Sequence, residues 1–393
     1  RAATVLRDVR VLAVAQTTQG EDDAKNILGK TATLELTAQQ AEILALAEAM
    51  ACPVIQTSGG TSFIQGLEDR TFPYGFSDAA IEAVVESDLC VAIGTELGEP
   101  VHYGKWRHWA KNNDQRKWVY IELDPTAIGV NRPVDVPLVG DLRAVVPQLT
   151  AALGARPRKE SPKLKGWIES DKKRLAELAE SAPILDGPMH TARWVVEATK
   201  AFPKEGIMVR DGGATVIFQW TYSMCKPHDV IWNQNFGHLG TGLPYAIGAS
   251  LADNKKRPVM FLTSDSAFLF HIGELETVAR LGLPLVTVVG VDNQWGLEVG
   301  VYKRTFGHGK STEPGVHWSK AVRFDKIAQG LGCEGKYVER PEELGPAIKA
   351  AFASGRPTVI HVPIDPVVNH GGIDNQGMPN YSEFRTWYAE GTQ

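Results

Sequence analysis

The sequence has few cysteines, no membrane-length apolar run and no strong charge of either sign. Its 393 residues include only Cys52, Cys90, Cys225 and Cys333, with no CxxC spacing. This argues against a structural zinc site and a disulfide framework and fits a reducing compartment. Because neither a membrane-length segment nor a signal peptide is recognisable, we expect a cytoplasmic protein without membrane association. The net charge of −5 is too small to predict a nucleic-acid partner.

The first part of the chain alternates predicted helices and short apolar strands. The segment AQQAEILALAEAMA (38–51) has apolar residues at helical spacing, whereas LCVAIGT (89–95) and KWVYIELD (117–124) are apolar runs typical of buried strands. Such alternation predicts a parallel sheet covered by helices. We assign residues 1–155 to a Rossmann-like central domain, with VRVLAVAQ (9–16) as a candidate first strand.

A second α/β unit follows a segment rich in Pro, Lys and Arg, GARPRKESPKLKG. Near-continuous apolar runs such as PVMFLTSD and PLVTVVGVD are typical of parallel strands buried on both faces. We therefore predict an α/β protein with two doubly wound parallel-sheet domains. After the central domain, we expect a linker and charged surface helix (156–188), a second domain (189–367) and a C-terminal tail (368–393).

Two carboxylates close consecutive strands of the second domain. Asp265 ends one apolar run, Asp292 ends the next, and GELETVARLGLP (273–284) between them predicts a helix. Parallel neighbouring strands end at the same edge of a sheet, where open α/β sheets bind ligands. Two nearby carboxylates repel each other, and Mg2+ is a cation that would relieve the conflict. The alternative is that Asp265 is only a helix N-cap.

Small residues beside Asp265 suggest a phosphate-bearing ligand. Ser266 and Ala267 precede the predicted helix, where free backbone N–H groups favour an anion. The stretch RDGGAT (210–215) offers a second glycine-bearing strand end that approaches an anion closely.

These motifs together resemble the thiamine-diphosphate enzymes. SDSAFLFHIGELETVARLGLPLVTVVGVDNQWG (264–296) is similar to the diphosphate-binding motif that begins GDG, and GHLGTGLPYAIGASLA (237–252) is similar to a segment of acetolactate synthases. VYIELDPTAIGVNRPVDVPLVGDLRAVVPQL (119–149) resembles the end of that family's central domain. Serines replace both glycines of GDG, and Asp292 replaces an asparagine, which leaves the metal site with one more negative charge.

The resemblance implies thiamine diphosphate and Mg2+ as cofactors and assigns residues to them. The implied metal ligands are Asp265, Asp292 and the backbone carbonyl of Gln294. Leu239 would wedge between the two cofactor rings. The remaining implied cofactor contacts are Gly213, Ala214, Thr215, Gly237, His238, Ser266, Ala267, Gly296 and Leu297.

The implied activity is cleavage or formation of C–C bonds next to a carbonyl, as in 2-oxo acid decarboxylation and carboligation by acetolactate synthases. Leu297 and Val301 would face the substrate, and His238 and His271 are candidate proton shuttles. A second implied activity is that of 2-hydroxyacyl-CoA lyases or oxalyl-CoA decarboxylases, with an acyl-CoA substrate. The sequence also leaves open a nucleotide-binding module without chemistry and a catalytically silent subunit.

The central domain leaves its ligand open, with FAD, ADP and CoA as the candidates. No GxGxxG motif decides among them. The basic segment HYGKWRHWAKNNDQRK (102–117) is a candidate for nucleotide contacts, against the alternative of a solvated loop.

The glutamate that activates the cofactor in this family lies in a pyrimidine-binding domain, and we recognise no such domain in the sequence. The chain begins with Arg1, so we expect a fragment, a processed chain or a partner-dependent subunit. The expected partner is a second copy or a separate chain carrying that domain. No catalytic residue is therefore assigned beyond the pocket candidates.

Overall fold

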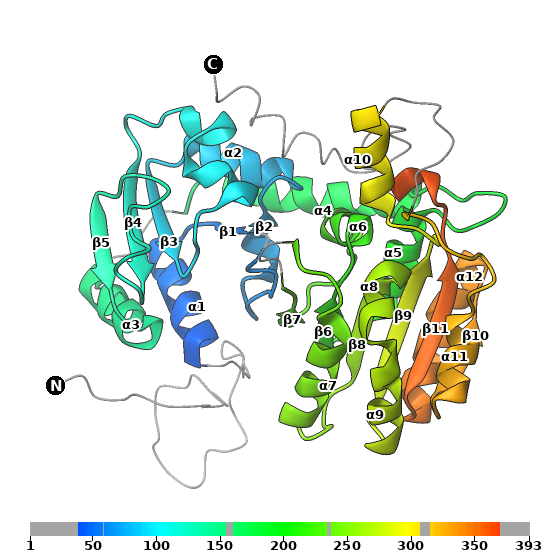
Figure 1. The fold of residues 1–393 in the computed structure, drawn as a ribbon. Helices are drawn as coiled ribbons and strands as arrows, with labels where there is room; N and C mark the ends of the chain where they lie inside the picture. Colours follow the sequence, from blue (N-terminus) through cyan, green and yellow to red (C-terminus); the bar gives the residue numbers. More distant parts are fainter. Residues whose placement is uncertain (1–37, 58, 155–159, 234–236, 307–314, 370–393) are drawn as a thin grey trace, which may run out of the picture. The chain divides into compact units, whose positions relative to one another are not determined.

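The computed structural model describes residues 38–57, 59–154, 160–233, 237–306 and 315–369. They form two compact units (Figure 1). One unit comprises residues up to 56, 63–74 and 78–169, and the other comprises 57–62, 75–77 and the chain from 170 onward. The predicted first strand at 9–16 and most of the predicted C-terminal tail lie outside the described residues.

The first unit contains two small parallel sheets. One pairs β1 with β2, and the other has the order β3-β4-β5. Its elements are α1 (Ala38–Met50), β1 (Val54–Gln56), η1 (Glu68–Arg70), β2 (Thr71–Pro73), α2 (Asp78–Glu86), β3 (Leu89–Ile93), η2 (Glu99–Gly104), η3 (Arg107–Ala110), β4 (Lys117–Glu122), β5 (Val136–Val139) and α3 (Leu142–Leu153).

Alternate residues of β4 build the core on the two faces of the three-stranded sheet. Trp118 and Tyr120 are buried with Trp109 on one face. Ile121 is buried on the other face against Val146 of α3. The period of two along a strand explains why one apolar run supplies both layers.

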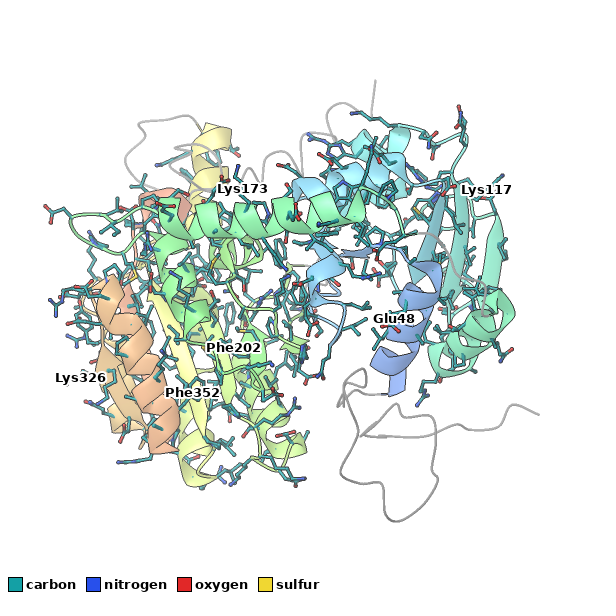
Figure 2. All side chains as sticks on the ribbon, turned by 180° about the vertical axis from the view of Figure 1, so that it is seen from behind. Glu48, Lys117, Lys173, Phe202, Lys326 and Phe352 are labelled. Atoms are coloured by element: carbon teal, nitrogen blue, oxygen red, sulfur yellow. The ribbon has the colours of Figure 1, made fainter. Side chains whose placement is uncertain are left out.

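The second unit is a six-stranded parallel sheet of order β10-β11-β9-β8-β6-β7. The helix α4 (Leu164–Ser181) precedes it, as the charged sequence predicts, and Lys173 projects outward from this helix in Figure 2. The other elements are α5 (Thr191–Lys200), β6 (Ile207–Arg210), α6 (Ala214–Tyr222), β7 (Asp229–Ile231), α7 (Gly242–Ala252), β8 (Val259–Ser264), α8 (Asp265–Phe268), η5 (Leu269–Glu274), α9 (Leu275–Arg280), β9 (Leu285–Val291), α10 (Gly296–Phe306), α11 (Phe324–Gly330), β10 (Glu334–Tyr337), α12 (Pro341–Ser354), β11 (Thr358–Pro363) and η6 (Val367–Asn369).

Helices cover both faces of this sheet. One core layer contains Trp194 of α5, Phe218 of α6 and Ile348 of α12, with Phe202 and Phe352 packed against it (Figure 2). The opposite layer contains buried residues of α7, α9 and α11. Because both faces are covered, β8 and β9 consist entirely of buried residues, which explains their continuous apolar sequence.

One local expectation changes. The predicted helix at 273–284 is split, because the 3-10 helix η5 ends at Glu274 and α9 runs only from Leu275 to Arg280. The kink lies at His271, whose backbone is not helical. No helix among the described residues has the length and apolar character needed to cross a bilayer.

The buried histidine of β11 gives this unit an expected pH dependence. His361 accepts the N–H of Phe324 through Nδ1 at 3.2 Å, and burial lowers its pKa to about 4. In the unfolded chain a histidine titrates near pH 6.5, so only the neutral form suits the folded state. Its contribution is therefore fully present above about pH 6.5 and is lost as the pH falls toward 4, by about 3 kcal/mol.

Urea unfolding of wild type and His361→Gln at several pH values measures this contribution. The glutamine keeps an acceptor for the Phe324 N–H but does not titrate. We expect the stability advantage of wild type to shrink between pH 6.5 and pH 4. An advantage that stays constant over this range would contradict a neutral, buried His361.

Candidate functional site

The two predicted carboxylates meet at the carboxyl-terminal edge of the second sheet. β8 and β9 are parallel neighbours, with Ser264 opposite Gly290. Asp265 follows the last residue of β8, and Asp292 follows the last residue of β9. The fold therefore brings these acidic side chains together, as the strand order inferred from the sequence requires.

Asp265 is fully buried at the start of α8. Its Oδ2 accepts the N–H of Asn293 at 2.8 Å, and its Oδ1 accepts the N–H of Ser266 at 2.9 Å. Burial, and then the charge of Asp292, raise its pKa well above the usual value. The cap of α8 is Ser264, whose side chain accepts the Ala267 N–H, so the interpretation of Asp265 as only the N-cap is wrong.

Asp292 is held by two amide groups. Its Oδ2 accepts from Nδ2 of Asn369 at 2.8 Å and from Nε2 of Gln294 at 3.3 Å. Burial raises its pKa to about 6 despite these hydrogen bonds. Asn369 is fully buried, and its Oδ1 lies 3.0 Å from the hydroxyl of Thr191. The sequence interpretation missed Asn369 because it assigned residues from 368 onward to the tail.

The turn after β9 is fixed by a distant segment. Asn293 has a left-handed backbone, with φ of 59°. The Trp295 N–H donates to Val316 O at 2.8 Å, and the Trp318 N–H donates to Asn293 O at 3.0 Å. Gln294, the third predicted metal residue, is 3% exposed and also donates from Nε2 to the Pro366 carbonyl at 2.6 Å. This bracing sets the position of the loop that carries the predicted metal ligands.

The donor set suits a hard divalent cation. Burial raises the pKa of both carboxyl groups, and the charge of Asp292 raises that of Asp265 further, so a cation would stabilise the charged pair. Mg2+ prefers oxygen ligands shared with phosphate. Asn293 Oδ1 is buried and has no hydrogen-bond partner among the described residues. No group of three His, Cys, Asp or Glu side chains forms a metal cluster in the described part of the chain. A site here therefore requires oxygen atoms beyond the two carboxylates, such as a backbone carbonyl and ligand phosphates.

The glycine-bearing turn after β6 lies against the same strand end. Gly212 has φ of 115°, and a Cβ there would lie 2.3 Å from Thr215 Oγ1 and 2.9 Å from Ser264 Oγ. Only glycine fits so close an approach. Thr215 Oγ1 is buried without a hydrogen-bond partner among the described residues. A buried hydroxyl without a partner in the predicted diphosphate turn fits a contact with a polar ligand.

Helix α6 begins at this turn with open backbone donors. Its N-cap, Gly213, provides no side-chain hydrogen bond, and Ala214 and Thr215 form the first positions of the helix. The N–H groups of a first helical turn lack intrahelical acceptors and favour an anion. Gly213, Ala214 and Thr215 therefore fit a diphosphate.

A further aspartate, missed in the sequence, joins this turn to α7. Asp211 is buried, and its two carboxylate oxygens accept the N–H groups of Gly212 and Gly242, each at 2.7 Å. Burial raises its pKa. Asp211 thus positions the diphosphate turn relative to the neighbouring helix.

Ser266 and Ala267 differ from the expectation of free N–H groups. The Ser266 N–H donates to Asp265, and the Ala267 N–H donates to Ser264 Oγ at 3.5 Å. Ser264 Oγ also lies 2.8 Å from Ser266 Oγ. Asp265 therefore satisfies the Ser266 N–H and Ser264 satisfies the Ala267 N–H, which leaves the first residues of α6 as the candidate donors to a diphosphate.

Residues 237–239 belong to the same unit and are at least partly exposed. Gly237 has φ of 64°, His238 is exposed and Leu239 is half-buried. His271 Nδ1 lies 2.7 Å from Gly240 O. This contact gives His271 a structural role in holding the loop.

Leu297 closes the site from α10. A Cβ on Gly213 would lie 3.2 Å from Leu297 Cδ1, so the two residues are in close contact. A Cβ on Gly296 would lie 2.8 Å from Asn369 Cβ and 3.2 Å from Asp292 Oδ2, so glycine is required there as well. Val301 belongs to the same helix, but its side chain is outside the described part of the structure.

Comparison with protein families identifies the class of these two units. The model described as "Thiamine pyrophosphate enzyme, C-terminal TPP binding domain" matches residues 211–362, and the central-domain model of the same enzymes matches residues 27–149. The chain belongs to the thiamine pyrophosphate enzyme family. A model of the Flp pilus assembly protein RcpC/CpaB also matches residues 1–52, most of which lie outside the described structure.

Individual relatives carry several activities in their names. The chain is 29% identical over 341 residues to a probable acetolactate synthase large subunit of Methanocaldococcus jannaschii, a match covering 83% of this chain and 55% of that protein. It is 26% identical to a 2-hydroxyacyl-CoA lyase of Arabidopsis thaliana (83% and 57% covered) and 26% identical to an oxalyl-CoA decarboxylase of Escherichia coli (78% and 53%). The chain thus spans about half the length of the relatives it matches.

Proposed function

We propose that this chain binds Mg2+ and thiamine diphosphate and is part of an enzyme that breaks or forms C–C bonds next to a carbonyl. The observation that carries the proposal is the convergence of Asp265 and Asp292 beside the open donors of α6 and the orphaned Thr215 hydroxyl. A cation between the carboxylates would neutralise their repulsion and bring phosphate oxygens toward these donors.

Each residue has a defined part in holding the cofactor. Asp265, Asp292 and the Gln294 carbonyl would hold the metal, and Gly213, Ala214 and Thr215 would donate to the diphosphate. Asn369 orients Asp292 through its amide, and Asp211 orients the diphosphate turn. Thiamine diphosphate supplies an electron sink for the reacting carbonyl carbon.

The substrate we propose is a 2-oxo acid, with decarboxylation and carboligation as the reaction. An acetolactate synthase is the more similar of the relatives described above, which supports this choice. An acyl-CoA substrate is the second candidate, because acyl-CoA enzymes are also among the relatives. The experiment is a screen of 2-oxo acids against acyl-CoA thioesters, with CO2 and aldehyde products followed.

The pyrimidine end of the cofactor would need a carboxylate from outside the two described units. The family resemblance places an activating glutamate there, on a domain of the same protein or of another copy. The assay therefore includes a co-purified partner or a longer chain if either is obtained. Proton exchange at C2 of thiamine diphosphate reports whether the activating group is present.

Leu239→Ala tests the proposed wedge between the cofactor rings. We expect turnover of the substrate found in the screen to fall about 100-fold, while cofactor affinity changes less than about threefold, because metal and phosphate contacts hold the cofactor. Leu251→Ala is the matched control, since Leu251 is 43% exposed at the far end of α7. Equal turnover in wild type and Leu239→Ala would show that Leu239 only packs.

A further inference from the structure

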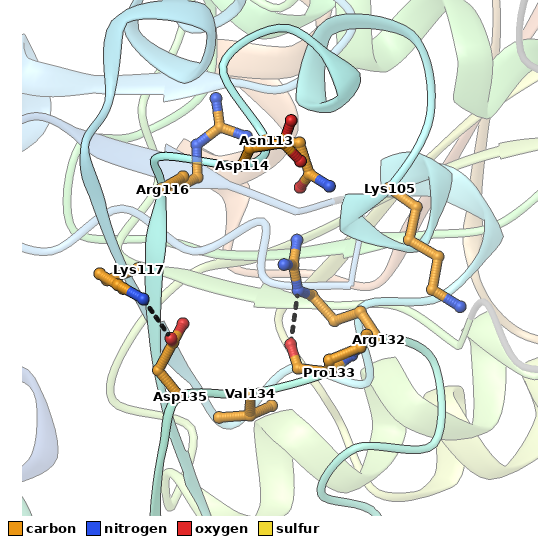
Figure 3. Close-up of a pocket in the computed structure, with 9 residues that line it drawn as sticks. All are labelled: Lys105, Asn113, Asp114, Arg116, Lys117, Arg132, Pro133, Val134 and Asp135. Atoms are coloured by element: carbon orange, nitrogen blue, oxygen red, sulfur yellow. Dashed lines mark hydrogen bonds and ion pairs between the residues drawn. The ribbon is translucent and has the colours of Figure 1, made fainter.

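A cavity of about 470 Å3 opens at the amino-terminal edge of the sheet β3-β4-β5 (Figure 3). Its walls come from the loop before β4 and the loop before β5. Open α/β sheets usually bind nucleotides at the carboxyl ends of their strands. This cavity lies at the opposite edge of the sheet. The lining residues are Lys105, Asn113, Asp114, Arg116, Lys117, Arg132, Pro133, Val134 and Asp135.

Two buried guanidinium groups give the cavity its positive charge. Arg116 is 3% exposed and Arg132 is 7% exposed, and neither forms an ion pair within the described chain. Arg116 is bonded by protein oxygens, including the carbonyls of Trp109 and Val84. Burial lowers the pKa of Arg132 to about 10, and the charge of Arg116 adds to this effect. The charge of Asp135 acts on Arg132 in the opposite direction, but the two groups form no ion pair, so a bound anion would stabilise the buried guanidinium.

Arg132 has a donor to spare for that anion. Its Nε donates to the Pro133 carbonyl at 3.1 Å, its Nη1 donates to the Gly104 carbonyl, and its guanidinium lies 3.7 Å from the ring centre of Trp118. These contacts fix the plane of the group. The second terminal nitrogen has no acceptor among the described residues, and Figure 3 shows the guanidinium between Pro133 and the segment carrying Asn113.

Lysines complete the cationic lining. Lys117 is already paired with Asp135 at 2.9 Å. Lys105 is half-buried, and its amino group lies 5.8 Å from the ring centre of Trp106, without a carboxylate partner among the described residues. Asp114 is exposed and opposes an anion. The cavity therefore offers two hydrogen-bond donors to an anion, Arg132 and Lys105. One carboxylate that is unpaired in the described chain, Asp114, would repel the anion.

We propose that this cavity is an anion site that takes the phosphate group of a small molecule. An arginine fixed in plane and a lysine on a flexible stem are the pair of donors that phosphate recognition uses. The volume exceeds the need of inorganic phosphate and accommodates an organic phosphate. All of its residues belong to the first unit, whereas the proposed thiamine diphosphate ligands belong to the second.

The test is calorimetric titration with inorganic phosphate and with ADP, in the presence of saturating thiamine diphosphate and Mg2+. Saturation keeps the probes out of the diphosphate turn. We expect Lys105→Gln to weaken binding about fivefold or more and Asp114→Asn to strengthen it about twofold or more, because each changes one charge at the cavity. Lys326→Gln, on the surface of α11, is the matched control and should bind as wild type does (Figure 2).

The two probes separate the source of the phosphate. Tighter binding of ADP than of phosphate indicates a nucleotide, whereas equal affinities indicate that only the phosphate group is recognised. The proposal is overturned if neither probe binds wild type saturably, or if Lys105→Gln and Asp114→Asn bind both probes as wild type does. If thiamine diphosphate itself fails to bind, the proposed function fails, but the comparison of Lys105 and Asp114 variants still decides this site.

Discussion

Replacing Asp265 by asparagine should abolish Mg2+-dependent binding of thiamine diphosphate while changing the stability of the unliganded fold little. The carboxylate is fully buried beside Asp292, which raises its pKa. Without metal, the neutral amide removes this repulsion, but its NH2 group cannot accept one of the two backbone N–H groups that the carboxylate accepts. These two effects oppose each other, so the unliganded variant should unfold close to the wild-type temperature. With metal, one of few oxygen ligands is lost, and we expect affinity to fall by at least about 100-fold.

Calorimetry with thiamine diphosphate and Mg2+, together with thermal unfolding in a chelator, measures both effects. Glu276→Gln is the matched control, because it removes a negative charge from an exposed ion pair with Arg280 on α9. The control should bind the cofactor as wild type does. Unchanged cofactor affinity in Asp265→Asn would refute the metal assignment, and a large loss of stability would mean that the variant reports folding rather than binding.

Gly242→Ala should destabilise the second unit by about 3 kcal/mol or more. A Cβ at this first position of α7 would lie 2.2 Å from Phe261 Cε2 and 2.7 Å from Asp211 Cβ. Phe261 is fully buried in the strand β8, so the helix end must move instead. That movement also breaks the hydrogen bond from the Gly242 N–H to Asp211. We therefore expect weaker cofactor binding as well.

Gly248→Ala on the same helix provides the control. Nothing lies within 4 Å of a Cβ at Gly248, and the position is exposed. An alanine there should stabilise the helix by about 0.5–1 kcal/mol. Urea unfolding of the two variants compares the same chemical change in two environments. Equal stabilities would contradict the close approach of α7 to the sheet.

The strands and the acidic strand ends were predictable because their physical signals are local. A parallel strand covered on both faces must be apolar throughout, so β8 and β9 stand out in the sequence. Right-handed crossover connections place such strands side by side. The meeting of Asp265 and Asp292 follows from these two rules.

The residues that hold the site in place from distant parts of the chain were not predictable in the same way. Asn369 reaches Asp292 from beyond β11, and the backbone at 316–318 holds Asn293 and Trp295 through hydrogen bonds. Neither segment has a periodic pattern that marks its destination. Asp211 was overlooked because the N–H groups that it accepts, on Gly212 and Gly242, come together only in the folded chain.

Short elements were also not predictable, because they carry no distinct sequence pattern. β10 has only four residues, none of them buried, so no apolar run indicates a strand. It forms because β11 offers it a parallel edge. The role of Ser264 as cap of α8 was likewise hidden, since Asp265 beside it is also a common N-cap residue.

The central claim is that Asp265 and Asp292 hold a metal that binds a diphosphate. The most direct measurement is a calorimetric titration of the wild-type chain with thiamine diphosphate and with inorganic pyrophosphate, each with Mg2+ and with a chelator. Pyrophosphate carries only the metal-binding end of the cofactor and does not depend on the pyrimidine end. We expect saturable binding of both ligands at one site with Mg2+ and the loss of this binding in the chelator. Equal affinities with and without Mg2+, or no binding of either ligand, would contradict it.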